Sequence, residues 1–143
     1  MSFRYQDKEK DWVTNMIKED YVSFETAKLL KEKGFNSHCH FAKKTTEIKH
    51  KEEEGEWMSE SEELTYIPTL QMAMKWLREV HKIHISVEMG FDVDNHQYYF
   101  FAPSVCRFSD KSGEYETPFG EKEFNTCEQA CEASIRYCLE NLI

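Results

Sequence analysis

The sequence is poor in glycine and lacks the motifs in which glycine serves catalysis or phosphate binding. Only five glycines occur in 143 residues, and none of them belongs to a Gly-rich phosphate loop. No G-x-S-x-G turn presents a serine nucleophile either. These absences exclude the common nucleotide-binding and serine-hydrolase signatures. We therefore expect no cofactor and favour a protein without enzymatic activity.

Long hydrophobic runs and clusters of basic residues are also missing. The longest apolar runs span a few residues, whereas a membrane helix needs about 20. The first residues, MSFRYQDKEKDW, are charged from the start and contain no apolar signal-peptide core, so we expect a cytoplasmic protein. A surface that binds nucleic acid requires clustered Lys and Arg to neutralise phosphates. We therefore expect neither a membrane nor a nucleic-acid partner.

Acidic residues exceed basic ones, and the excess is local. The net charge is -9, from 27 acidic and 18 basic residues. Most of it comes from residues 51–63, which contain seven acidic residues and one lysine, a net of -6. This run has no periodicity, so we predict an acidic, mobile loop at about 51–64 within a single domain spanning 1–143. Trp57 inside the loop is a candidate for an interface contact.

Five cysteines are expected to be free thiols, because the number is odd and the chain has no export signal. Cys127, Cys131 and Cys138 share one face of a predicted helix. Thiols on one face can bind a soft metal, and a helix N-terminus can lower the pKa of a cysteine in its first turn, as for Cys127. Cysteine is also among the most buried residue types, so we favour packing of this face in the core.

Four segments have the apolar periodicity of helices. Ser23, Thr69 and Thr126 are placed to cap three of them at the N-terminus. Gln129 completes a capping box with Thr126, and Gly34 is placed to end the second helix. The predicted helices span residues 8–18, 24–33, 70–81 and 127–141.

Alternating apolar and polar residues predict strands between these helices. The alternation is clearest at 83–89, directly after the third helix. Because hairpin-length links join the later strands, we predict an α+β fold with a mostly antiparallel sheet of three to five strands, packed by about four helices. Weaker strand patterns occur at 36–42, 45–50, 97–108 and 114–117.

The helix predicted at 70–81 has more apolar surface than one core face requires. Met72 and Trp76 lie on a flank of its main apolar face, so the total apolar arc is about 200°. Trp and Met are enriched at interface cores, which makes both residues candidates for an interface, most simply that of a homodimer. The alternative is that the N-terminal helix, or the acidic loop through Trp57, covers Trp76 within the chain.

His38, His40 and His50 are the candidates for a metal site. His38 and His40 project to the same side of a predicted strand, and two imidazoles with a third ligand can hold zinc. Their spacing matches no established zinc pattern, so exposed strand histidines are the favoured interpretation. The metal site remains as the alternative, with a small metal-dependent enzyme as its functional consequence.

Three blocks of the sequence carry a resemblance. YVSFETAKLLKEKGF, PTLQMAMKWLREVHKIHI and FNTCEQACEASIRYCLENL together cover roughly 50 of the 143 residues. They resemble a group of small uncharacterised proteins carried by phages and mobile elements of gut anaerobes, which share AKLLKEKGF-, PTLQMAMKWLRE- and EEACEAAIKYCLENL-like blocks. The resemblance implies a shared fold and a mobile genetic context, and it implies no activity.

These observations predict a non-enzymatic accessory or regulatory protein of a phage or mobile element that acts through protein–protein contacts. Its partner is expected to be a host or phage protein, or a second copy of the chain. A second alternative is an acidic mimic of nucleic acid that occupies a DNA-binding protein. Such a mimic needs carboxylates spaced over a rigid surface, and a mobile acidic loop provides that poorly.

Overall fold

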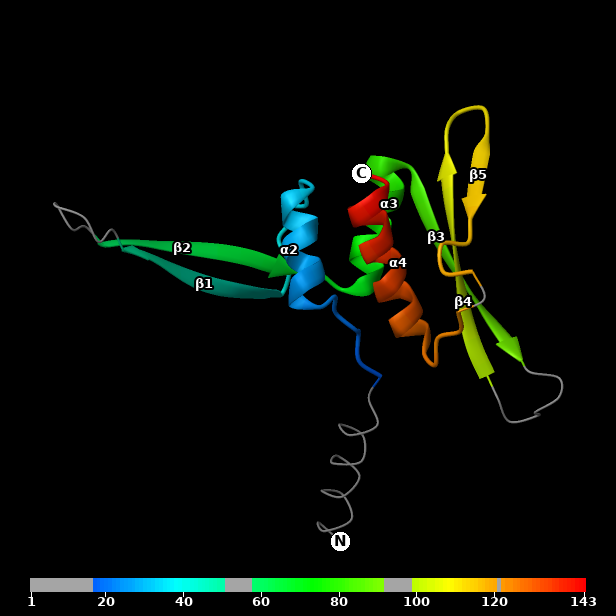
Figure 1. Ribbon diagram of the computed structural model, residues 1–143, viewed down its shortest axis with the longest axis horizontal. Helices are drawn as coiled ribbons and strands as arrows, with labels where there is room; N and C mark the ends of the chain where they lie inside the picture. The colour runs from blue at the N-terminus through cyan, green and yellow to red at the C-terminus, as the bar shows by residue number, and fades with distance from the viewer. Residues whose placement is uncertain (1–16, 51–57, 92–98, 121) are drawn as a thin grey trace, which may run out of the picture.

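The computed structural model describes residues 17–50, 58–91, 99–120 and 122–143, without the side chains of residues 47–50 and 58–60. Within these ranges the chain is an α+β protein with three helices and two small antiparallel sheets (Figure 1). The helix predicted at 8–18 lies outside the described residues except for residues 17 and 18, which are not helical. None of the described helices is long and apolar enough to cross a membrane.

The first described helix, α2, spans Phe24–Glu32 and agrees with its prediction to within a residue. The hydroxyl of Ser23 accepts a hydrogen bond from the Thr26 amide, which satisfies one of the free donors of the first turn. Gly34 has a φ of +103° and turns the chain back, so that the amide of Phe35 reaches the carbonyl of Leu30 at 2.9 Å.

Helix α3, Leu70–His81, runs almost directly into strand β3, Ile83–Phe91. The hydroxyl of Thr69 caps the helix by accepting from the Met72 amide. Only Lys82, in the left-handed region at φ 58°, separates helix from strand. The sequence prediction for this segment is therefore confirmed at both of its elements.

A three-stranded antiparallel sheet contains β3, β4 and β5, in that order. Strand β4 spans Tyr99–Phe108 and strand β5 spans Gly113–Glu116. Helix α4, Cys127–Asn141, begins at the Thr126 cap and packs across β3 and β4. The core therefore lies between this sheet and helices α3 and α4, and it continues between α4 and α2. Its fully buried side chains include Leu30, Leu77, Val105, Ile135 and Leu139.

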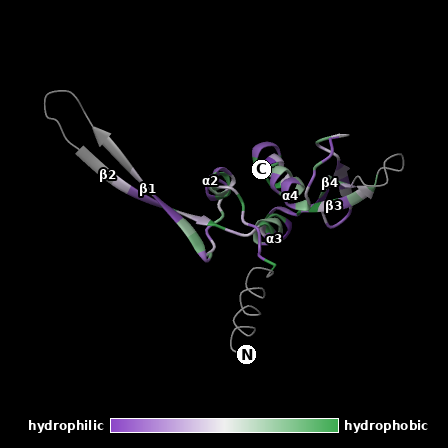
Figure 2. Ribbon diagram, turned by 90° about the horizontal axis from the view of Figure 1, so that it is seen from below, coloured by the Kyte–Doolittle hydropathy of each residue, from purple (hydrophilic) through white to green (hydrophobic). Residues whose placement is uncertain are grey.

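The other sheet is a long hairpin of two strands. Strand β1, Phe41–His50, pairs with β2, Met58–Ile67, in an unbroken antiparallel register from Phe41 opposite Ile67 to His50 opposite Met58. Figures 1 and 2 show the hairpin extending away from the helices, with only its base beside α2. We refer to β1 and β2 together as the arm.

The arm corrects two sequence predictions. Residues 58–64, predicted as part of a mobile loop at 51–64, form strand β2, while residues 51–57 lie outside the described part. The strand predicted at 36–42 and its partner at 45–50 are replaced by the single strand β1. Both errors have one cause: hydrophobic periodicity marks strands with one buried face, whereas most of this hairpin is solvent-exposed on both faces.

Candidate functional site

The base of the arm is fixed to helix α2 by charged and apolar contacts. The ammonium of Lys31 donates to Oε1 of Glu63 at 2.9 Å and to the carbonyl of Leu64 at 2.7 Å. The ammonium of Lys43 lies 4.2 Å from the centre of the Phe24 ring. Thr65 is almost fully buried at this junction, so the two strands leave the body at a defined point.

Beyond this base the arm has no cover from the rest of the described chain. The whole arm contains ten residue pairs over about 30 Å, and the five pairs from Thr46–Glu62 to His50–Met58 lie beyond the base. Both strands have an outer edge that pairs with no other described strand. A two-stranded hairpin alone is only marginally stable in water. The two strands differ in charge where their side chains are described, because β1 contains Lys43 and Lys44 whereas β2 contains Glu62 and Glu63.

The arm also separates the three candidate histidines. Nδ1 of His38 lies 2.8 Å from the hydroxyl of Tyr66, and their rings meet edge to face at 5.0 Å. His40 is exposed next to the base of the arm. His50 ends strand β1, about 30 Å from its beginning, so its backbone lies far from the other two histidines. The structure brings His38 to Tyr66 and does not bring the three histidines to one point.

Trp76 packs within the chain, whereas Met72 faces solvent. The Trp76 ring makes edge-to-face contacts with Phe35 at 5.7 Å and with His81 at 4.7 Å, and it lies against the core. Met72 on the same flank of α3 is 38% exposed. Among the described residues the cover comes from Phe35, after α2, and from His81, while the two segments expected to supply it lie outside the described residues apart from residues 17 and 18. Trp57 lies outside the described residues, so its contact remains a prediction.

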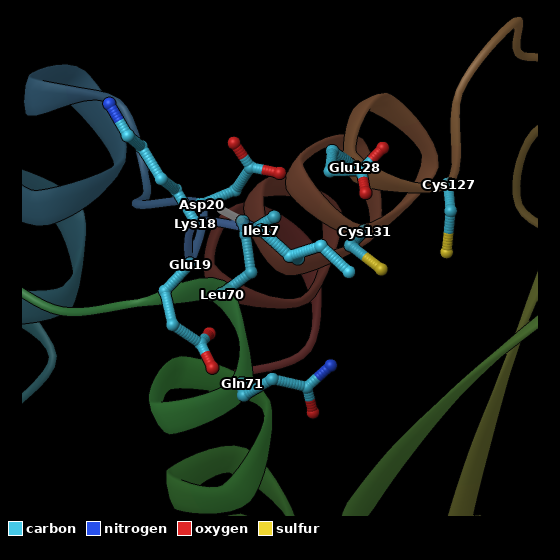
Figure 3. A pocket seen from close by; sticks show the side chains of 9 residues that line it. All are labelled: Ile17, Lys18, Glu19, Asp20, Leu70, Gln71, Cys127, Glu128 and Cys131. Atoms are coloured by element: carbon cyan, nitrogen blue, oxygen red, sulfur yellow. The ribbon is translucent and has the colours of Figure 1, made fainter. Parts of the chain in front are cut away.

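A surface cavity of about 260 Å³ opens where residues 17–20 pass the N-terminal ends of α3 and α4 (Figure 3). Cys127 and Cys131 line it from α4, with Leu70 and Gln71 from α3. Ile17 and four charged residues complete the lining: Lys18, Glu19, Asp20 and Glu128.

The two thiols at this cavity interact with each other. Cys127 is half-buried in the first turn of α4, and Cys131 lies one turn further on with 6% of its surface exposed. Burial raises the pKa of Cys131 to about 12, and a hydrogen bond with the Cys127 side chain adds to the increase. The prediction that the three cysteines of α4 pack in the core is confirmed for Cys131 and Cys138, which are buried. Cys127 is only half-buried and lines the cavity.

A second cavity of about 510 Å³ adjoins the first and shares Asp20, Leu70 and Glu128 with it. Tyr21 and Glu132 also line it, and Glu132 accepts hydrogen bonds from α2. Neither cavity could be predicted from the sequence, because both depend on how residues 17–23 cross the end of α4. In the described part of the chain, no group of three or more His, Cys, Asp or Glu side chains is placed to hold a metal ion.

No family model, curated protein or solved structure matches the chain. The resemblance to proteins of phages and mobile elements therefore stays a prediction.

Proposed function

We propose that this chain is a non-enzymatic accessory or regulatory protein that acts through protein–protein contacts, and that the arm is its partner-binding element. One observation carries the proposal: five of the ten residue pairs of the arm lie beyond its base, and the contacts that hold the arm to the other described residues lie at that base. The phage or mobile-element context predicted from the sequence is consistent with such a role and forms part of the proposal.

The open edges of the arm favour a protein partner. An exposed strand edge carries unpaired backbone N–H and C=O groups, which a strand of another protein can pair with. Pairing would also convert a marginal two-stranded hairpin into a larger sheet, so the partner stabilises the arm as it binds. The lysines of β1 and the glutamates of β2 then select the partner by the charge that it places beside each edge.

Exposed apolar side chains at the base of the arm extend this surface. Phe41 is 55% exposed although it touches Tyr21, and Leu64 is 39% exposed. Large apolar side chains that remain exposed next to a free strand edge provide the area that a stable contact needs. The partner is a host or phage protein, or a second copy of the chain.

A shortened arm tests the proposal. Residues 46–62 are replaced by Asn-Gly, which joins Thr45 to Glu63, two residues that face each other in the register. The contacts of Lys31 and Thr65 at the base are retained, so the core should unfold at the temperature of the unaltered chain. Affinity isolation from cells that naturally make the protein, followed by mass spectrometry, should recover a partner with the full arm and lose it with the short one.

The matched control is Glu79→Gln on the exposed side of α3, which leaves the arm intact and should retain the partner. The purified partner should then bind the full chain directly, and light scattering would reveal a second copy as the partner. Equal recovery of the same partner by the short-arm variant would reject the arm as the binding element.

A further inference from the structure

We propose that Cys127 and Cys131 form a two-thiolate binding site for a soft monovalent metal cation of the Cu(I) class, reached through the cavity of Figure 3. The site belongs to α4, and it goes beyond the proposed function because it does not depend on the arm. Both thiols line the same cavity, and their side chains already share a hydrogen bond.

The helical spacing of the two cysteines suits a metal bridge better than a disulfide. Cβ atoms four residues apart on a helix are about 5–6 Å from each other, whereas a disulfide requires about 3.5–4.5 Å. Forming that bond would unwind the first turn of α4. A metal–thiolate bond is about 2.3 Å long, so an ion between two sulfurs accommodates a separation of up to about 4.6 Å. The ion fits the helix as it stands.

The number of donors selects the type of metal. Soft thiolate ligands favour Cu(I) and zinc among the common ions. Zinc sites take four ligands, and the described residues bring no third metal-ligating side chain to this pair. Cu(I) is satisfied by two thiolates in a near-linear arrangement. A soft two-coordinate cation is therefore the class of ligand that the pair can hold.

The charges around the cavity favour a cation over the common thiol reagents. Glu19, Asp20 and Glu128 line it together with a single basic residue, Lys18. A cleft lined by carboxylates raises the local concentration of cations and lowers that of anions. Small disulfides that carry carboxylates are therefore disfavoured at Cys127, whereas a metal cation is attracted.

Binding would release two protons. Cys127 and Cys131 each exchange the S–H proton for a bond to Cu(I), which gives a bis-thiolate complex of charge -1 and two H⁺ in solution. No electron is transferred, since the metal enters and remains as Cu(I). Because protons are released, affinity should increase with pH.

The test is a competition titration of the full chain, reduced and free of oxygen, with Cu(I) buffered by bicinchoninate. We expect the chain to remove one Cu(I) per molecule from the chelator, with the stoichiometry confirmed by native mass spectrometry. Cys127→Ser should weaken binding by more than roughly 100-fold, because even the loss of groups that only support a ligand costs up to this factor. Cys127 is half-buried at the start of the helix, so serine there should not prevent folding.

The double variant Cys39→Ser and Cys106→Ser is the matched control, since these thiols lie on other elements and should not affect binding. Cys131→Ser, checked for folding by circular dichroism, should repeat the loss seen with Cys127→Ser. Three results would each overturn the site: no competition with the chelator, wild-type affinity in Cys127→Ser, or loss of binding in the double control variant. None of these results bears on the arm, so the two proposals fail separately.

Discussion

The hydroxyl of Thr26 donates a 2.6 Å hydrogen bond to Oε1 of Glu132, and this bond joins the first turn of α2 to the middle of α4. The backbone amide of Ser23 donates to the same oxygen at 3.0 Å. Thr26 has no exposed surface, so water cannot replace Glu132 as the acceptor of its hydroxyl. One carboxylate thus holds the capped start of α2 against the core helix.

Replacing Thr26 with valine removes this bond and keeps the shape of the side chain. Hydrogen bonds to charged groups typically contribute about 1.5–3 kcal/mol, and Oε1 of Glu132 keeps one donor, so we expect a loss of about 1–2 kcal/mol in the free energy of unfolding. Urea unfolding measures it. Thr117→Val at an exposed position is the control and should change stability by less than about 0.5 kcal/mol. Equal effects of the two substitutions would show that the bond contributes nothing.

Trp76→Ala should destabilise the chain without changing its oligomeric state. The ring touches Phe35 and His81 and lies against the core, so we expect a loss of about 3 kcal/mol, at the lower end for large aromatic truncations. Met72→Ala on the same flank should cost less than about 1 kcal/mol. Thermal unfolding together with light scattering distinguishes the cases. A change in molecular mass at unchanged stability would instead make Trp76 an interface residue.

Gly90→Ala should destabilise the β3–β4 pair. A Cβ added at Gly90 would collide with the ring of Phe100, which lies directly across from it in the register. Overpacking of this kind typically costs about 1–3 kcal/mol. The double variant Gly90→Ala, Phe100→Leu makes room for the methyl group and should lose less than the sum of the two single variants. Additive losses in urea unfolding would mean that the ring and the glycine are independent.

Stability should fall between pH 9 and about 12 in part because of Cys138, in addition to the contribution of Cys131. Burial, assisted by the nearby Glu116 carboxylate, raises the pKa of this thiol from 9.0 to about 12. In the unfolded chain the thiol loses its proton near pH 9, while the folded chain keeps it. The folded state then binds more protons, and Cys138 contributes a decrease in the free energy of unfolding with a slope approaching about 1.4 kcal/mol per pH unit.

The variant Cys138→Ala isolates this contribution. Alanine cannot ionise, so its stability should decline less steeply over the same pH range, as measured by urea unfolding at several pH values. Cys106→Ala, on the three-stranded sheet, serves as the control. Identical slopes for the wild type and Cys138→Ala would contradict the assigned origin of the pH dependence.

The helices could be predicted from the sequence because their signals are local. Ser23, Thr69 and Thr126 each cap the helix for which they were assigned, through a side-chain oxygen that accepts from the amide three residues later. Gly34 ends α2 for an equally local reason, a positive φ. These features depend on neighbouring residues alone, so no knowledge of the tertiary structure was needed.

The candidate sites could not be predicted in the same way, because they depend on distant parts of the chain. The sequence around Glu63 predicts an acidic loop, because the partner of Glu63, Lys31, is 32 residues away in the sequence. Trp76 is predicted as apolar surface beyond the main core face of its helix, because its contact with Phe35 forms only in the folded chain. The cavity beside Cys127 exists because residues 17–20 cross the end of α4, which no periodicity encodes.

Site-specific photo-cross-linking tests the central claim most directly. A photoreactive residue is placed at Thr46, exposed on the arm, and separately at Glu79, exposed on α3, in cells that naturally make the protein. The adducts are then identified by mass spectrometry. The account predicts one discrete adduct from position 46, either a partner protein or a second copy of the chain, and none from position 79. An adduct from position 79 alone, or from neither position, would contradict the arm as the partner-binding element.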